Sequence, residues 1–76
     1  MAVFGQVVNG LPEGKGITYW NDGNRYEGDF RNGKYEGKGI YYSNSGDREM
    51  GDYYNDKPIG KHAYLTKNGE VYTNNY

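Results

Sequence analysis

The chain has 76 residues, of which 34% are hydrophobic, with 13 glycines, ten tyrosines, no cysteine and a formal net charge of −1. This length allows one domain with a small core, and the lack of cysteine excludes a disulfide framework and a thiolate metal site. The aromatic content argues against a disordered chain, and the charge argues against nucleic-acid binding.

The sequence repeats with a period of 23 residues. Residues 14–36, GKGITYWNDGNRYEGDFRNGKYE, align without a gap with residues 37–59, GKGIYYSNSGDREMGDYYNDKPI, and the pattern continues as GKHAYLTKNGEVYTNNY. Residues 3–14 match the second half of such a unit. We therefore predict a single module with a partial repeat at 1–13, full repeats at 14–36 and 37–59, and an incomplete repeat at 60–76.

Each repeat is predicted to be a β-hairpin, because the runs 14–21 and 24–31 are rich in aromatic and β-branched residues without helical periodicity. The predicted two-residue turns are Asp22-Gly23, Ser45-Gly46 and Asn68-Gly69. The hairpins are expected to be joined by five-residue links, NGLPE, NGKYE and NDKPI. Pro12 and Pro58 would then lie outside the strands.

Pairing through these turns places Tyr19 opposite Tyr26, and side-chain alternation then collects apolar residues on one face of the sheet. We predict that this face forms a groove and that the other face, with Trp20, Tyr41 and a solvated His62, is mostly polar. Glycines 5, 28 and 51 are expected to make room for neighbouring rings and to bend the sheet. The predicted groove residues are Ile17, Tyr19, Tyr26, Phe30, Ile40, Tyr42, Tyr53, Leu65 and Tyr72.

Residues 26–33, YEGDFRNG, followed by EGKG at 36–39, resemble the MORN repeat, the membrane occupation and recognition nexus motif. The resemblance covers essentially the whole chain. The copies depart from the motif where Val3 and Glu49 replace the leading tyrosine, His62 replaces a glycine, and Asn74 replaces another. The Glu49 copy is therefore expected to interrupt the aromatic groove at that point.

The resemblance implies an all-β fold in which tandem 23-residue antiparallel hairpins form a single elongated, twisted sheet with a concave aromatic groove. It implies a non-enzymatic module that binds a protein segment as a scaffold, or phosphoinositides as some proposals hold. Such modules also occur as parts of larger enzymes. We therefore expect a protein partner or a second copy of the chain in the groove; the alternative is that the rings serve only as the core of the sheet.

A second pattern is basic and follows the repeat, near the links between hairpins: Lys15, Lys34, Lys38, Lys57 and Lys61. These lysines are predicted to form a rim that could attract an anionic membrane lipid, at about 1 kcal/mol per lysine near the surface. The alternative is that they are solvated turn residues.

Catalysis is not expected, because one histidine and scattered carboxylates provide neither a triad nor a perturbed acid–base pair. We predict no enzyme, no cofactor and no metal. No stretch approaches the roughly 20 apolar residues that cross a bilayer, and no signal peptide is evident. An intracellular protein is favoured, with the membrane periphery as the alternative location. The sequence leaves open whether the chain is a piece of a longer protein.

Overall fold

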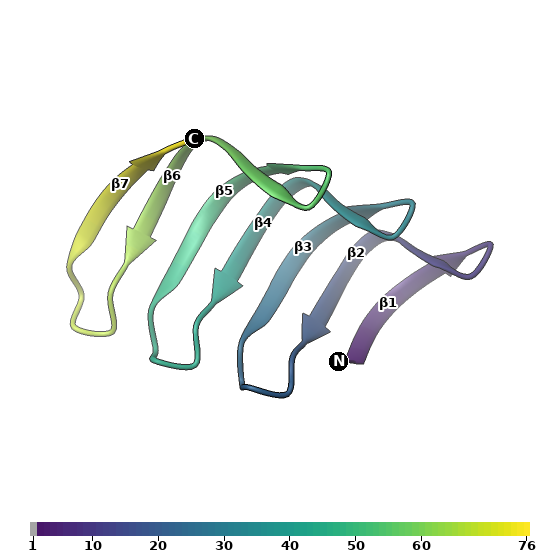
Figure 1. Cartoon of the computed structure of the whole chain (residues 1–76), viewed down its shortest axis with the longest axis horizontal. Coiled ribbons are helices and arrows are strands. Elements are labelled where there is room, and N and C mark those ends of the chain that lie inside the picture. Colours follow the sequence, from purple (N-terminus) through teal and green to yellow (C-terminus); the bar gives the residue numbers. More distant parts are fainter. Residues whose placement is uncertain (1) are drawn as a thin grey trace.

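The computed structural model describes residues 2–76, which form a single sheet with dimensions of 40 × 26 × 14 Å (Figure 1). Seven antiparallel strands follow one another in chain order, and the sheet is open at both ends. The strands are β1 (Ala2–Val8), β2 (Leu11–Tyr19), β3 (Arg25–Arg31), β4 (Lys34–Tyr42), β5 (Arg48–Tyr54), β6 (Lys57–Leu65) and β7 (Val71–Asn75). The predicted all-β fold of tandem hairpins is confirmed. Within the described residues there is no helix that is long and apolar enough to cross a membrane.

The connections after β1, β3 and β5 lie along one long edge of the sheet (Figure 1). Each consists of two residues with positive φ, as in Asn32 at 51° and Gly33 at 83°. Two consecutive positive φ angles are typical of the tight type I′ hairpin turn. The predicted five-residue links are therefore wrong: each is a two-residue turn followed by the start of the next strand.

The connections after β2, β4 and β6 lie along the opposite edge (Figure 1). In the first, Trp20 N donates to Asn24 O at 3.0 Å and Gly23 N donates to Trp20 O at 3.1 Å. The loop therefore holds three residues, with Gly23 at a φ of 93°, rather than two as predicted. This geometry is the common three-residue hairpin loop, in which a turn is followed by a glycine with positive φ.

One additional loop residue changes the register of the strand pair. Thr18, and not Tyr19, lies opposite Tyr26, and Gly16 lies opposite Gly28. Because side chains alternate between faces, a one-residue shift moves every side chain of the shifted strand to the other face. The predicted face assignment is therefore wrong for β2, β4 and β6.

Both prolines lie within strands, contrary to the prediction. Pro12 in β2 is opposite Val7, and Pro58 in β6 is opposite Tyr53. Each lies close to an irregularity in the strand pairing, between Gly5 and Val7 in the first case and between Met50 and Asp52 in the second. Proline has no backbone N–H to donate to a regular ladder, so it is tolerated where the pairing is irregular.

A row of glycines crosses the sheet, one on each of five consecutive strands: Gly5, Gly16, Gly28, Gly39 and Gly51. A Cβ atom on Gly39 would lie 2.3 Å from the Tyr26 ring, and one on Gly51 would lie 2.4 Å from the His62 ring. A Cβ atom on Gly28 would meet the backbone of β4 at 2.4 Å and the Tyr26 hydroxyl at 2.8 Å, and one on Gly5 would meet the backbone of β2. The predicted role in making room for a ring is confirmed for Gly51 and in part for Gly28, and it is wrong for Gly5, where the close neighbour is backbone.

The chain forms a single layer, and its small core lies on one face of the sheet. Tyr26, Phe30 and Tyr53 are buried there, together with Thr18 and His62. We call this side the aromatic face and define it by the rings of Trp20, Tyr26, Phe30, Tyr35, Tyr41, Tyr53, His62 and Tyr76. The other side is called the opposite face.

Candidate functional site

The rings of the aromatic face contact one another in a continuous chain. The Tyr26 ring stacks on Tyr35, with centroids 3.9 Å apart and an angle of 12° between the planes. Phe30 and Tyr53 meet Tyr26 edge to face at 5.4 and 5.2 Å. Such edge-to-face pairs favour a fixed arrangement of rings. The face therefore presents a preorganised aromatic surface.

The structure divides the predicted groove residues between the two faces. Tyr26, Phe30, Tyr53 and Tyr72 share the aromatic face. The other five lie on the opposite face: Ile17, Tyr19, Ile40, Tyr42 and Leu65. Binding by any of these residues stays a prediction, but the nine cannot line one groove.

Trp20 and Tyr41, which are predicted to lie on the polar face, lie on the aromatic face instead. Tyr35 lies there too and pairs with Phe30 inside the sheet, although the sequence predicts that it belongs to a link. The available signal is an aromatic residue two positions after the Asn32-Gly33 turn.

His62 was predicted to be solvated, but it is 1% exposed. Its Nε2 atom is 2.8 Å from the Asp52 carbonyl oxygen, which can only accept, so Nε2 carries a hydrogen. One repeat earlier, the Tyr26 hydroxyl donates to the Asp29 carbonyl at 3.0 Å. His62 therefore performs from β6 the role that Tyr26 performs from β3.

This replacement depends on two linked substitutions between the repeats. Glu49 occupies the position that corresponds to Tyr26, and His62 occupies the position that corresponds to Gly39. The ring is thus lost from one strand and supplied by the next. The sequence signal was the coincidence of the two departures from the repeat, which lie on neighbouring strands.

Glu49 contacts the buried histidine and forms hydrogen bonds with two residues at the C-terminal end. Its Oε2 atom is 2.9 Å from His62 Nδ1, and its side chain is only 14% exposed. Nδ1 lies at ion-pair distance without hydrogen-bond alignment. Oε2 also accepts from the Tyr76 hydroxyl at 2.6 Å, and Oε1 accepts from Asn74 Nδ2 at 3.4 Å. A buried charge needs such partners.

Three adjoining hollows open on the aromatic face. The first, of about 340 Å³, lies beside Trp20 and Tyr35; the middle one, of about 270 Å³, lies between those rings and Glu49. The third, of about 220 Å³, adjoins Glu49 and Asp47. Each hollow has at least one carboxylate in its wall. The aromatic face is therefore both aromatic and acidic.

The negative potential of these carboxylates reaches the tyrosine hydroxyls. Burial raises the pKa of Tyr35 to about 12, with a contribution from the charge of Asp56 and against a lowering hydrogen bond from Thr18. Burial also raises the pKa of Tyr53, and the charge of Glu49 raises it further. A cation placed at these rings would be stabilised by the same negative potential.

A second pair of linked differences between the repeats positions Asp56. The repeat position that holds Pro12 and Pro58 holds Tyr35 in the middle copy, which adds a backbone N–H. Asp56 Oδ1 accepts that N–H at 2.9 Å. The two earlier turns have glycine where Asp56 stands, and Asp56 adopts a φ of 68°. The structure thus keeps a carboxylate beside the middle hollow.

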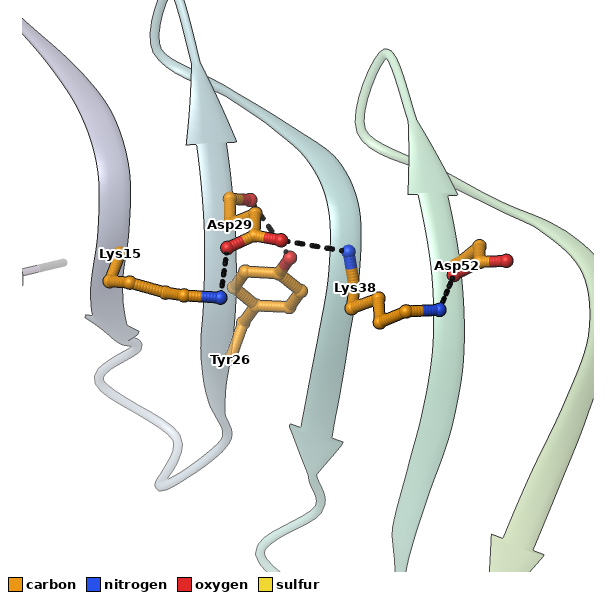
Figure 2. Close-up of polar contacts among 5 residues, drawn as sticks. All are labelled: Lys15, Tyr26, Asp29, Lys38 and Asp52. Carbon is orange, nitrogen blue, oxygen red and sulfur yellow. Dashed lines mark hydrogen bonds and ion pairs between the residues drawn. The ribbon is translucent and has the colours of Figure 1, made fainter.

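The opposite face carries a ladder of alternating charges, which Figure 2 shows. Lys15 on β2 pairs with Asp29 on β3, and Lys38 Nζ on β4 lies 3.3 Å from Asp52 on β5. The backbone N–H of Lys38 also donates to Asp29 at 3.1 Å. The Lys15 ammonium and this N–H hold the pKa of Asp29 below its usual range.

These ion pairs change the expectation for the lysines. Lys15 and Lys38 lie beside carboxylates, and Lys34 Nζ donates to Asn55 Oδ1 at 2.8 Å. Lys61 lies opposite the neutral Asn75. Because the nearest carboxylates offset two of the five positive charges, the lysines offer a weaker attraction to anionic lipid than their number indicates. Lipid binding stays a prediction.

Residues 2–76 contain no group of three or more histidine, aspartate or glutamate side chains that could hold a metal ion. A family model of the MORN repeat matches residues 4–25 and 26–48. No curated protein matches the chain at a significant level.

Proposed function

The chain belongs to the MORN-repeat family, a non-catalytic repeat module generally involved in binding or scaffolding, and from that premise we propose that its aromatic face binds a protein segment. The segment lies across the strands and contacts the three adjoining hollows. Catalysis has no part in this proposal.

The observation that supports it is the exposure of an organised aromatic surface. No layer of the described chain covers the aromatic face, and Trp20, Tyr35 and Tyr41 remain only half-buried. Monomeric proteins rarely leave contiguous apolar patches of more than a few hundred Å² without a binding role. Rigid tryptophan and tyrosine side chains are common anchors of protein interfaces.

Tyr41 and Tyr42 provide a matched test, since they are neighbours in sequence, similar in burial and on opposite faces. Peptides of about 12 residues would be selected from a random displayed library on the wild-type chain, and their affinities measured by calorimetry. We expect Tyr41→Ser to weaken binding about tenfold or more, the loss typical of an interface anchor. Tyr42→Ser should change the affinity less than about twofold, because surface changes outside an interface have small effects.

Circular dichroism must show that both variants stay folded. If Tyr42→Ser removes binding and Tyr41→Ser does not, the opposite face is the binding surface and the proposal is wrong. If no peptide is enriched over an unrelated protein, the aromatic face does not bind segments of this kind.

Self-association is a second candidate, supported by the two unpaired edges of the sheet. β1 and β7 each pair with only one neighbour, and Val71 at the β7 edge is 68% exposed. Unpaired strands with exposed apolar side chains are templates for pairing with another chain.

We therefore expect oligomers in sedimentation velocity at concentrations of tens of micromolar, and expect Val71→Lys to shift them to monomer. Thr73→Lys, on the same strand and the same face, tests whether the effect depends on the position at which the positive charge is introduced. A monomer whose sedimentation does not change with concentration would exclude this candidate.

A further inference from the structure

The middle hollow of the aromatic face combines ring surfaces with negative charge. Tyr76 and Pro58 lie at its wall, together with four further aromatic side chains and two carboxylates: Trp20, Tyr35, Tyr41, Tyr53, Glu49 and Asp56. We call these six residues the cation cage. Among the described residues that line it there is no lysine and no arginine. The volume of about 270 Å³ is smaller than that of pockets for drug-sized ligands, and suits a single side chain or head group.

The rings of the cage stand at steep angles to one another. Trp20 is nearly perpendicular to Tyr35, at 89° and 6.2 Å, and is tilted by 47° to Tyr41 at 5.8 Å. Tyr53 meets Tyr35 at 84° and 6.1 Å. Rings at such angles present their faces in different directions around the hollow, while one face of Tyr35 is covered by Tyr26. The face of an aromatic ring carries negative charge density and attracts cations.

The two carboxylates differ in what they add. Glu49 is only 14% exposed, its Oε2 atom contacts His62 Nδ1 at 2.9 Å and accepts from Tyr76, and its Oε1 atom accepts from Asn74, so both of its oxygens already have partners. Asp56 is exposed, and its Oδ1 atom is used by the Tyr35 N–H. Asp56 is therefore the carboxylate that a bound cation can approach most freely.

This combination selects among cations. A lysine ammonium has three donors and is strongly hydrated, so it needs several acceptors when it leaves water. The cage offers few, because Oδ1 of Asp56 and Oε2 of Glu49 already accept hydrogen bonds. A methylated ammonium keeps its positive charge with fewer donors, and it is suited to a site made mainly of ring faces.

We propose that the cation cage binds a methylated ammonium group, presented by a methylated lysine of the segment that lies on the aromatic face. The inference rests on the proposed function for the identity of the segment. The cage itself is a separate site for the ammonium group, so it can be tested with a small probe.

The probe is choline, compared with its neutral isostere 3,3-dimethylbutan-1-ol. Trp20 is the only tryptophan, so a titration followed by tryptophan fluorescence reports on the wall of the cage. The upfield shift of the choline methyl protons in NMR is a second measurement. We expect saturable choline binding about tenfold tighter than binding of the alcohol, which is the usual size of a cation–π preference.

Asp56→Asn retains the acceptor for the Tyr35 N–H and removes the charge, and it should weaken choline binding at least about threefold. Asp52→Asn, on the opposite face beside Lys38, is the control and should leave choline affinity unchanged. Equal affinity for choline and the alcohol, or no saturable signal by either method, would overturn the inference.

The two proposals fail in different ways. If selected peptides bind and choline does not, the cation cage is wrong and the proposed function stands. If choline binds and no peptide is selected, the cage stands and its occupant is a free methylated ammonium compound rather than a protein segment.

Discussion

Glu49→Tyr and His62→Gly should each destabilise the protein, and together they should restore most of the lost stability. His62→Gly empties a buried site and leaves the Asp52 carbonyl unpaired, which should lower the free energy of unfolding by about 2 to 4 kcal/mol. Glu49→Tyr adds a ring where the His62 ring already lies on Gly51, at about 1 to 3 kcal/mol for an overpacked core.

In the double variant, Tyr at position 49 and glycine at position 62 recreate the arrangement of Tyr26 over Gly39. The new hydroxyl can then donate to the Asp52 carbonyl, as the Tyr26 hydroxyl donates to the Asp29 carbonyl. We expect a favourable coupling energy of about 2 to 3 kcal/mol, at the upper end of values for residues in contact. Urea unfolding of the four proteins measures it.

A module of this length is expected to have only about 4 to 11 kcal/mol of stability, so the single variants are best measured with a stabilising osmolyte. Pairing each single substitution with Gln6→Ala, an exposed position in β1 at the other end of the sheet, gives an additive control. If the effects of Glu49→Tyr and His62→Gly also simply add, His62 does not replace the missing tyrosine ring.

Gly39→Ala should strongly destabilise the protein. The new Cβ atom would lie 2.3 Å from the Tyr26 ring, and Tyr26 is completely buried. Gly39 has an ordinary strand conformation, so the cost is steric, about 2 to 3 kcal/mol for a forced shift in a packed core. Tyr26→Ala should cost about 3 to 5 kcal/mol, as for other buried aromatic rings.

The same methyl group should be nearly neutral once the ring is gone. In the Tyr26→Ala background, Gly39→Ala is expected to change the free energy of unfolding by less than about 1 kcal/mol. Gly60→Ala is the matched control, because no atom lies within 4 Å of its added Cβ and only its φ of 71° opposes the change. It should cost about 1 to 2 kcal/mol in either background. An equal cost of Gly39→Ala with and without the Tyr26 ring would show that the ring does not define this site.

The strand register shows how much of the fold can be predicted from the local sequence. Asp22-Gly23 and Asn32-Gly33 both look like two-residue hairpin turns, and in both the glycine adopts a positive φ. They differ because Asn32 is also at positive φ, whereas Asp22 is not. No residue type in the two dipeptides requires that difference, since asparagine and aspartate both tolerate the left-handed region. The one-residue error that followed exchanged the faces of β2, β4 and β6.

The sequence alone determined the 23-residue repeat, the all-β class, the hairpins and the need for glycine beneath rings, because each follows from composition and periodicity along the chain. Only the tertiary structure decided which rings share a face and which atoms complete the site. Tyr26 meets Gly39, His62 meets Glu49, and Asp56 meets Tyr35 across strands. Those contacts require a register accurate to one residue, and the register depends on backbone angles that the residue types permit without specifying.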